Sequence, residues 1–197
     1  MRNAERVGRR AFLRSGARTI AGVALLQGLK RNVLAAPRSA RPLSRDEARV
    51  ITAAADRIWP GAGEAGFLAY ISRALSSTYA GDLRSYKSGA HCLDMAARTY
   101  FGRQFPMLRG EEQDRLLSSL QSGSLRSMPG LRGTKFFALL RQHVIEAVLS
   151  DPVYGGNRDF VGWKAVGYPG PRRQITASQQ TSMMPLDLPF QSIADLR

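Results

Sequence analysis

The chain has 197 residues, of which 44% are hydrophobic, and this supplies enough apolar surface for one domain of ordinary size. Its net charge is +14, but residues 1–36 hold eight basic residues and one acidic residue, which is half of the excess. The remaining basic residues are scattered, without an aromatic-interleaved stripe or a recognition motif, which argues against nucleic acid as a partner.

The N-terminal segment has the features of an export signal. Arg9 and Arg10 are followed after one residue by Phe12 and Leu13, and this pattern resembles a twin-arginine (Tat) motif. The apolar run 19–29 is too short to span a bilayer, which takes about 20 residues, but it fits a secretory signal. We therefore expect residues 1–36 to direct the chain to the periplasm through the Tat translocase.

Processing of this segment stays open. Val33, Leu34 and Ala35 offer a small-residue cleavage site, whereas Lys30 and Arg31 just before them are unusual for a cleaved signal. The sequence is compatible with removal of the signal or with its retention as a tether.

The rest of the chain predicts a linker, a helical domain and a tail. Residues 37–43 are rich in Pro and Arg, residues 44–171 carry helical periodicity, and residues 172–197 are expected to form an extended C-terminal arm. No segment shows a convincing strand pattern. The predicted fold class is all-α, a small bundle of four to five helices with an irregular loop rich in Gly, Pro and aromatic residues.

The helix boundaries follow from caps and breakers. The first helix opens with a capping box at Ser44 and Glu47 and ends at Trp59, and Asp82 and Thr134 are the expected N-caps of the third and fifth. The fifth is the most apolar, which favours a place at the centre of the bundle. The ranges expected for the five helices are 44–58, 64–79, 82–101, 110–120 and 134–150.

Candidate chemistry is sparse. His143 and Glu146 have a spacing that can place two ligands on one helix face, and Asp151 follows closely, so a free-standing periplasmic enzyme using these three residues is one alternative. A second ligand pair is missing, and we expect His143 to be a core-edge residue bonded to the following loop.

The glycine-rich stretch 61–66 lacks the strand that a dinucleotide site needs, and no haem motif occurs. We predict that this chain has no catalytic residues, binds no metal and holds no cofactor.

Cys92 is the single cysteine, so an intramolecular disulfide is excluded. Its helical pattern predicts a buried small hydrophobic side chain. A basic peripheral membrane-binding protein is a further alternative, given the net charge.

Residues 151–170, DPVYGGNRDFVGWKAVGYPG, combine glycines, prolines and four aromatic residues. A turn at 154–157 and a second at 168–170 need the positive φ values that Gly and Asn adopt readily. Trp, Tyr and Arg dominate interface energetics, so exposed members of this loop are candidates for contacting a partner. The expected loop-structuring residues are Asp151, Pro152, Tyr154, Gly155, Gly156, Asn157, Pro169 and Gly170, and the interface candidates are Arg158, Trp163, Lys164 and Tyr168.

This loop carries a family resemblance. Its pattern, together with AAADRIWPGAGEAGFLAYISRAL, FGRQFPML and FFALLRQHVIEAVLSDPVYGGN upstream, resembles the gluconate 2-dehydrogenase subunit 3 (gamma subunit) family over residues 44–171. The resemblance implies a small subunit without a cofactor that joins a large FAD-dependent dehydrogenase of the glucose-methanol-choline type, often with a multihaem cytochrome c subunit. It also implies a role in maturation, export and stability of the large subunit, which oxidises a sugar, sugar acid or alcohol at the periplasmic face of the inner membrane.

Overall fold

The computed structural model describes residues 41–125, 131–181 and 188–196. The twin-arginine motif, the apolar run after it and most of the linker lie outside the described residues. No strand occurs in the described part of the chain, and the prediction of an all-α fold is confirmed. None of the helices described is long and apolar enough to cross a bilayer.

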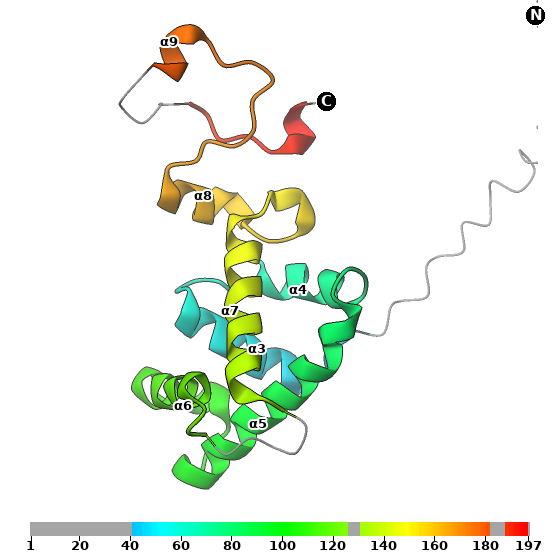
Figure 1. The fold of residues 1–197 in the computed structure, drawn as a ribbon, viewed down its shortest axis with the longest axis vertical. Helices are drawn as coiled ribbons and strands as arrows, with labels where there is room; N and C mark the ends of the chain where they lie inside the picture. Colours follow the sequence, from blue (N-terminus) through cyan, green and yellow to red (C-terminus); the bar gives the residue numbers. More distant parts are fainter. Residues whose placement is uncertain (1–40, 126–130, 182–187, 197) are drawn as a thin grey trace, which may run out of the picture. The chain divides into compact units, whose positions relative to one another are not determined.

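Helices α3 to α7 correspond in order to the five predicted helices (Figure 1). Their bounds are α3 Arg45–Ile58, α4 Phe67–Leu75, α5 Leu83–Phe101, α6 Gly110–Ser122 and α7 Gly133–Leu149. Shorter elements lie between and after them: the 3-10 turns η2 Ala80–Asp82, η3 Phe105–Met107, η4 Pro152–Tyr154, η5 Arg158–Phe160 and η6 Ile193–Leu196, and the helices α8 Val161–Val166 and α9 Ala177–Gln180.

The predicted start of the first helix is confirmed by its local hydrogen bonds. Ser44 and Glu47 form the capping box of α3, since each side chain accepts from the backbone N–H of the other at 2.7 and 3.2 Å. One cap differs from the prediction, because Thr134 lies inside α7, whose N-cap is Arg132. Asp82 is the N-cap of α5, as predicted, although its side chain makes no capping bond. Turns replace the two ends of the predicted second helix, at 64–66 and 76–79, and η2 follows it.

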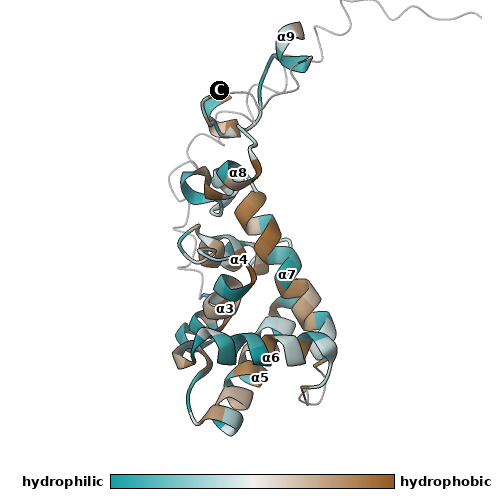
Figure 2. Cartoon of the chain, turned by 90° about the vertical axis from the view of Figure 1, so that its left-hand side faces the viewer, coloured by the Kyte–Doolittle hydropathy of each residue, from teal (hydrophilic) through white to brown (hydrophobic). Residues whose placement is uncertain are grey.

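Helix α7 is the central element of the fold, as its apolar sequence predicts. It packs against α3, α4, α5 and α6, and α8 lies across its C-terminal end (Figure 1). Its hydrophobic residues are prominent at the end near α8 (Figure 2). On α5, a Cβ added at Gly89 would lie 2.2 Å from the ring of Phe136, so this glycine lets the two helices approach closely. The large buried side chains of the core come from all five helices.

The loop after α7 is more regular than predicted. The segment expected to be irregular contains α8 between turns, a helix that is too short for its periodicity to be recognised. Positive φ values at Gly155 (+98°), Asn157 (+47°) and Gly170 (+97°) fit the two predicted turns. Asp159 and Phe160 also have positive φ, which the sequence does not suggest because side chains of this kind rarely adopt it.

Two glycines bring this loop onto the backbone of α7. A Cβ at Gly156 would lie 2.1 Å from the carbonyl oxygen of Ala147, and a Cβ at Gly162 would lie 2.0 Å from that of Val148. Neither distance is compatible with a side chain unless the backbone moves. The loop is therefore seated directly on the last turn of the central helix.

We expect Gly156→Ala to lower the free energy of unfolding by about 1–3 kcal/mol, the usual cost of overpacking a close contact. Chemical denaturation monitored by circular dichroism measures the change. Gly81→Ala is the matched control, because a Cβ there meets no atom within 4 Å. Equal stability of both variants would contradict the close packing of the loop on α7.

Candidate functional site

The C-terminal end of α7 is capped by side chains of the loop that follows it. Asn157 is fully buried; its Nδ2 donates to the Ser150 carbonyl at 2.9 Å, and its Oδ1 accepts from the Gly162 N–H at 2.9 Å. The indole Nε1 of Trp163 donates to the Leu149 carbonyl at 2.8 Å. These bonds satisfy helix-end carbonyls that have no partner within the helix.

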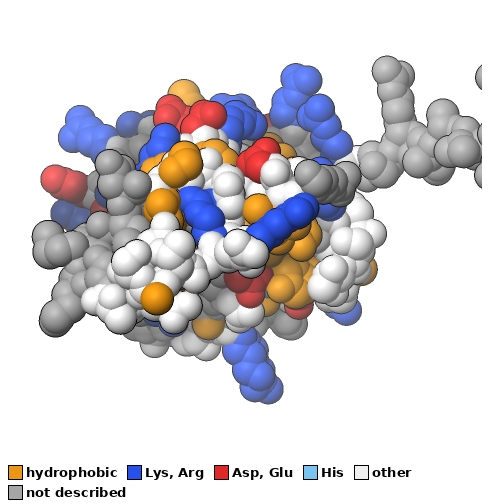
Figure 3. All heavy atoms as spheres, turned by 90° about the horizontal axis from the view of Figure 1, so that it is seen from above, with side chains coloured by type: hydrophobic (Ala, Val, Ile, Leu, Met, Phe, Trp, Pro, Cys, Tyr) orange, Lys and Arg blue, Asp and Glu red, His pale blue; other side chains and the backbone are white. Residues whose placement is uncertain are grey.

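The C-terminal segment folds back onto the same loop. The carboxylate of Asp151 accepts from the Ser192 hydroxyl at 2.5 Å, from the Ile193 N–H at 2.8 Å and from the Val153 N–H at 3.0 Å. Phe190 stacks on Phe160 with ring centroids 5.9 Å apart. The segment has little regular structure, as an extended arm would, but residues 188–196 are held against the domain. The face at this end mixes hydrophobic side chains with Lys and Arg (Figure 3).

His143 lies in the core and not at its edge. It is 1% exposed, its Nδ1 is 2.9 Å from the Tyr86 hydroxyl, and its ring stacks on Tyr79 with centroids 4.2 Å apart. The prediction that it bonds to the following loop is wrong, because its hydrogen-bond partner lies on α5. Burial lowers the pKa of His143, although the negative charge of Glu146 opposes this shift.

Glu146 receives three hydrogen bonds one turn further along α7. Its Oε2 accepts from the Tyr79 hydroxyl at 2.9 Å and the Tyr70 hydroxyl at 3.2 Å, and its Oε1 accepts from Gln142 at 2.8 Å. Burial alone would raise the pKa of Glu146, but hydrogen bonds from Gln142 and Tyr79 outweigh it and leave the pKa lowered. The carboxylate is therefore ionised at neutral pH.

The same carboxylate lines a groove between α4 and α7. The groove has a volume of about 650 Å³ and also includes the turn after α4 and the start of the loop after α7. Ala74 and Leu149 contribute apolar surface, and Arg73 lies at the groove with its guanidinium donating to the Val153 carbonyl at 2.9 Å. Tyr154, predicted to hold the loop to the bundle, is 52% exposed and lines this groove.

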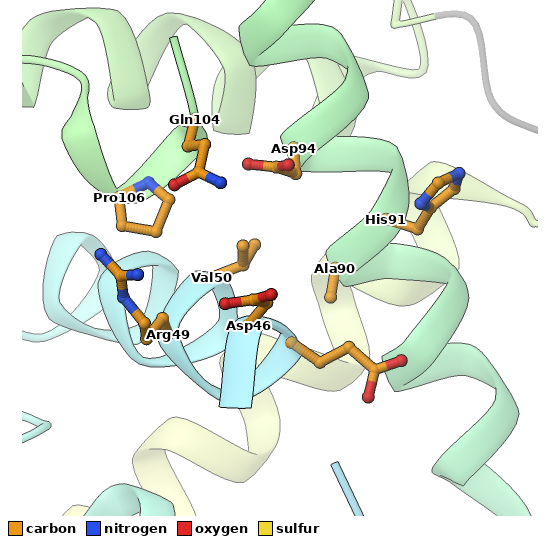
Figure 4. A pocket seen from close by; sticks show the side chains of 9 residues that line it. Asp46, Arg49, Val50, Ala90, His91, Asp94, Gln104 and Pro106 are labelled. Atoms are coloured by element: carbon orange, nitrogen blue, oxygen red, sulfur yellow. The ribbon is translucent and has the colours of Figure 1, made fainter. Parts of the chain in front are cut away.

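A second, smaller hollow of about 120 Å³ lies between α3, α5 and η3 (Figure 4). Asp46 and Asp94 face it, whereas the ring of His91 points away from it in this view. Asp94 accepts from the Phe105 N–H at 3.0 Å and from Arg98 at 2.9 Å, so it serves local structure. Within the described ranges, no group of three or more His, Cys, Asp and Glu side chains is placed to hold a metal ion.

The three residues of the enzyme alternative belong to separate hydrogen-bond networks. His143 bonds to α5, Glu146 bonds to tyrosines of α4 and the following turn, and Asp151 bonds to the C-terminal segment. The sequence could not show these partners, since they lie 41 to 76 residues away in the chain.

The four interface candidates divide into two groups. Arg158, Lys164 and Tyr168 are exposed and remain available to a partner. Trp163 is 4% exposed and packs edge-on against Tyr168, so its side chain stabilises the loop and does not face outward. Its indole N–H has a partner inside the chain, which is the physical reason that its expected role changes. Cys92 is buried, as predicted.

The fold and this site define a small all-α domain in which a glycine-rich loop and a returning C-terminal segment close over the end of a central helix. The family model of gluconate 2-dehydrogenase subunit 3 matches residues 45–170, which run from the start of α3 to the second turn of the loop. The chain belongs to this family, whose members are accessory subunits of a dehydrogenase complex. No curated protein and no solved structure matches the chain.

The buried imidazole makes stability depend on pH. An unfolded histidine titrates near pH 6.5, and the folded pKa of His143 lies below this value. Between the two values the unfolded chain binds more protons, so stability falls as the pH falls below about 6.5. We expect a lower urea midpoint at about pH 5.5 than at about pH 7.5, and a smaller difference in His143→Gln. An unchanged difference in the variant would show that His143 is not the responsible group.

The carboxylate of Asp151 holds the C-terminal segment. We expect Asp151→Ala to cost about 1–3 kcal/mol, because it leaves the donors of Ser192 and Ile193 without their acceptor. Hydrogen exchange measured by mass spectrometry should accelerate in residues 188–196 while α5 stays protected. Glu64→Ala, which removes an exposed acid, is the control. Unaltered exchange of this segment in Asp151→Ala would refute the anchoring role.

Proposed function

We propose that this chain is the non-catalytic small subunit of a periplasmic, membrane-associated flavoprotein dehydrogenase, and that it supports maturation, Tat export and stability of the FAD-containing large subunit. The observation that carries the proposal is the family match over residues 45–170, which spans the helical domain and its loop. The large subunit oxidises a sugar, sugar acid or alcohol, and a multihaem cytochrome c subunit is a further partner. FAD and haem belong to those chains.

The use of the polar side chains supports this proposal. His143, Glu146 and Asp151 are each engaged in bonds that hold elements of the fold together, and such bonds suit a scaffold. A small subunit of this kind needs a rigid surface that a larger chain can recognise, because ordering a mobile surface on binding costs free energy.

The loop after α7 offers such a surface. Its backbone is fixed by Asn157 and by the Arg158 N–H, which donates to the Ala65 carbonyl at 2.8 Å. The exposed side chains of Arg158, Lys164 and Tyr168 are thereby presented on a scaffold that is already ordered. We place the contact with the large subunit here.

Replacing the twin arginines tests the export role. We expect Arg9→Lys combined with Arg10→Lys to keep both this chain and the co-expressed flavoprotein in the cytoplasm. The Tat receptor recognises the two arginines, and one signal is enough to export two folded subunits that are bound to each other. Fractionation of spheroplasts and immunoblotting of both subunits measure the distribution. As a control, Arg2→Lys with Arg6→Lys changes two arginines outside the motif.

Purification in mild detergent completes this test. The flavoprotein should co-purify with a tagged wild-type chain in a stable ratio. Absence of the flavoprotein from the purified material, or its normal export beside the double-lysine variant, would contradict the proposal.

A further inference from the structure

The groove between α4 and α7 contains an ionised carboxylate that has no cationic partner in the described part of the chain. The ion pairs among all described residues join Arg57 to Asp114, Arg98 to Asp94, and Arg103 to Glu112, and none of them involves Glu146. Its three hydrogen bonds come from neutral donors, two phenols and an amide.

Among the described residues that line the groove, Arg73 alone is basic, and its side chain is engaged by another element. Arg73 donates to the Val153 carbonyl at 2.9 Å and so ties α4 to the loop after α7. Its guanidinium is thus bound to the loop after α7 and forms no ion pair with Glu146, which lies on α7. A charge in this position is only partly solvated, and a cation brought into the groove gains more from it than it would in open water.

The surroundings of this charge are apolar and aromatic. Tyr70, Ala74 and Tyr79 form one wall, and Ile145 and Leu149 form the other. Ile145 is 41% exposed although it lies on the central helix. A cation in this groove is attracted by the carboxylate, and an aromatic ring face within about 6 Å of a cation adds to such an attraction.

We propose that this groove takes up one arginine or lysine side chain, flanked by apolar residues, from a segment of the large subunit. The partner chemistry follows from charge complementarity, since a largely apolar groove whose carboxylate forms no ion pair with a described residue selects a long aliphatic stem that ends in a cation. The groove continues into the loop after α7 through Ser150 and Tyr154, so both surfaces can engage one partner at once. This inference rests on the proposed function and names its docking chemistry.

A peptide pair tests the chemistry without the large subunit. Acetyl-Leu-Arg-Leu-amide is titrated into the isotope-labelled full chain, and its citrulline analogue, which has the same shape without the charge, is the matched probe. We expect amide shift changes in residues 70–79 and 145–154 with the arginine peptide and about tenfold weaker binding of the citrulline peptide. Equal binding of the two peptides, shifts elsewhere, or no binding at millimolar concentration overturns the inference.

Glu146→Gln tests the same charge in the complex. Glutamine retains an oxygen that can accept from Tyr70 and Tyr79, so thermal melting should show that the variant folds. We expect it to bind the co-purifying flavoprotein about tenfold more weakly than wild type does. Glu111→Gln removes an exposed acid from α6, which does not line the groove, and should leave binding unchanged.

The outcomes separate the two proposals. If the wild-type chain retains no flavoprotein, the proposed function fails, whatever the peptides do. If the wild type binds the flavoprotein and a folded Glu146→Gln variant binds it equally well, the groove inference alone is wrong.

Discussion

The carbonyl oxygens at the C-terminal end of α7 lose their helical partners where Asp151 and Pro152 stop the helix, and the following loop supplies donors to them. Trp163 donates to one carbonyl and Asn157 to the next, while Asn157 also accepts from the backbone at the start of α8. Buried backbone groups without partners are costly, so the position of α8 follows from this requirement. The loop is thereby part of the central helix's own capping.

The second set of long-range bonds joins the helices around α7. His143 reaches α5 through Tyr86, and Glu146 reaches α4 and the turn after it through Tyr70 and Tyr79. These contacts place a neutral imidazole inside the core and an ionised carboxylate at its boundary, one turn apart on the same helix. Burial decides the first state and hydrogen bonding the second, which is why two neighbouring titratable groups respond to pH in different ranges.

The sequence predicts the helices well because their signals are local. The capping box at Ser44, the proline after Asp151 and the apolar periodicity of α7 each act within a few residues. The buried hydrogen-bond partners could not be predicted from the sequence, because His143 and Tyr86 are 57 residues apart and nothing near either residue indicates the other. The same holds for Asp151 and Ser192, whose contact turns an expected arm into a segment seated on the domain.

The sequence also predicts exposure wrongly for a residue type that is common both at interfaces and in cores. Trp163 was expected to face a partner because tryptophan is frequent at interfaces, but the same large ring and single donor suit a buried cap equally well. The groove at Glu146 could not be predicted either, because it forms between α4 and α7, which are far apart in the sequence.

The glycines of the loop have a consequence for how this protein can diverge. At Gly156, Gly162 and Gly170, a Cβ would lie about 2 Å from a carbonyl oxygen of α7 or of the C-terminal segment. Any other residue at these positions lowers the stability of the fold, whatever partner the surface meets. The glycine pattern of the loop can therefore persist as the sequence diverges, while its exposed side chains can change to suit a different enzyme.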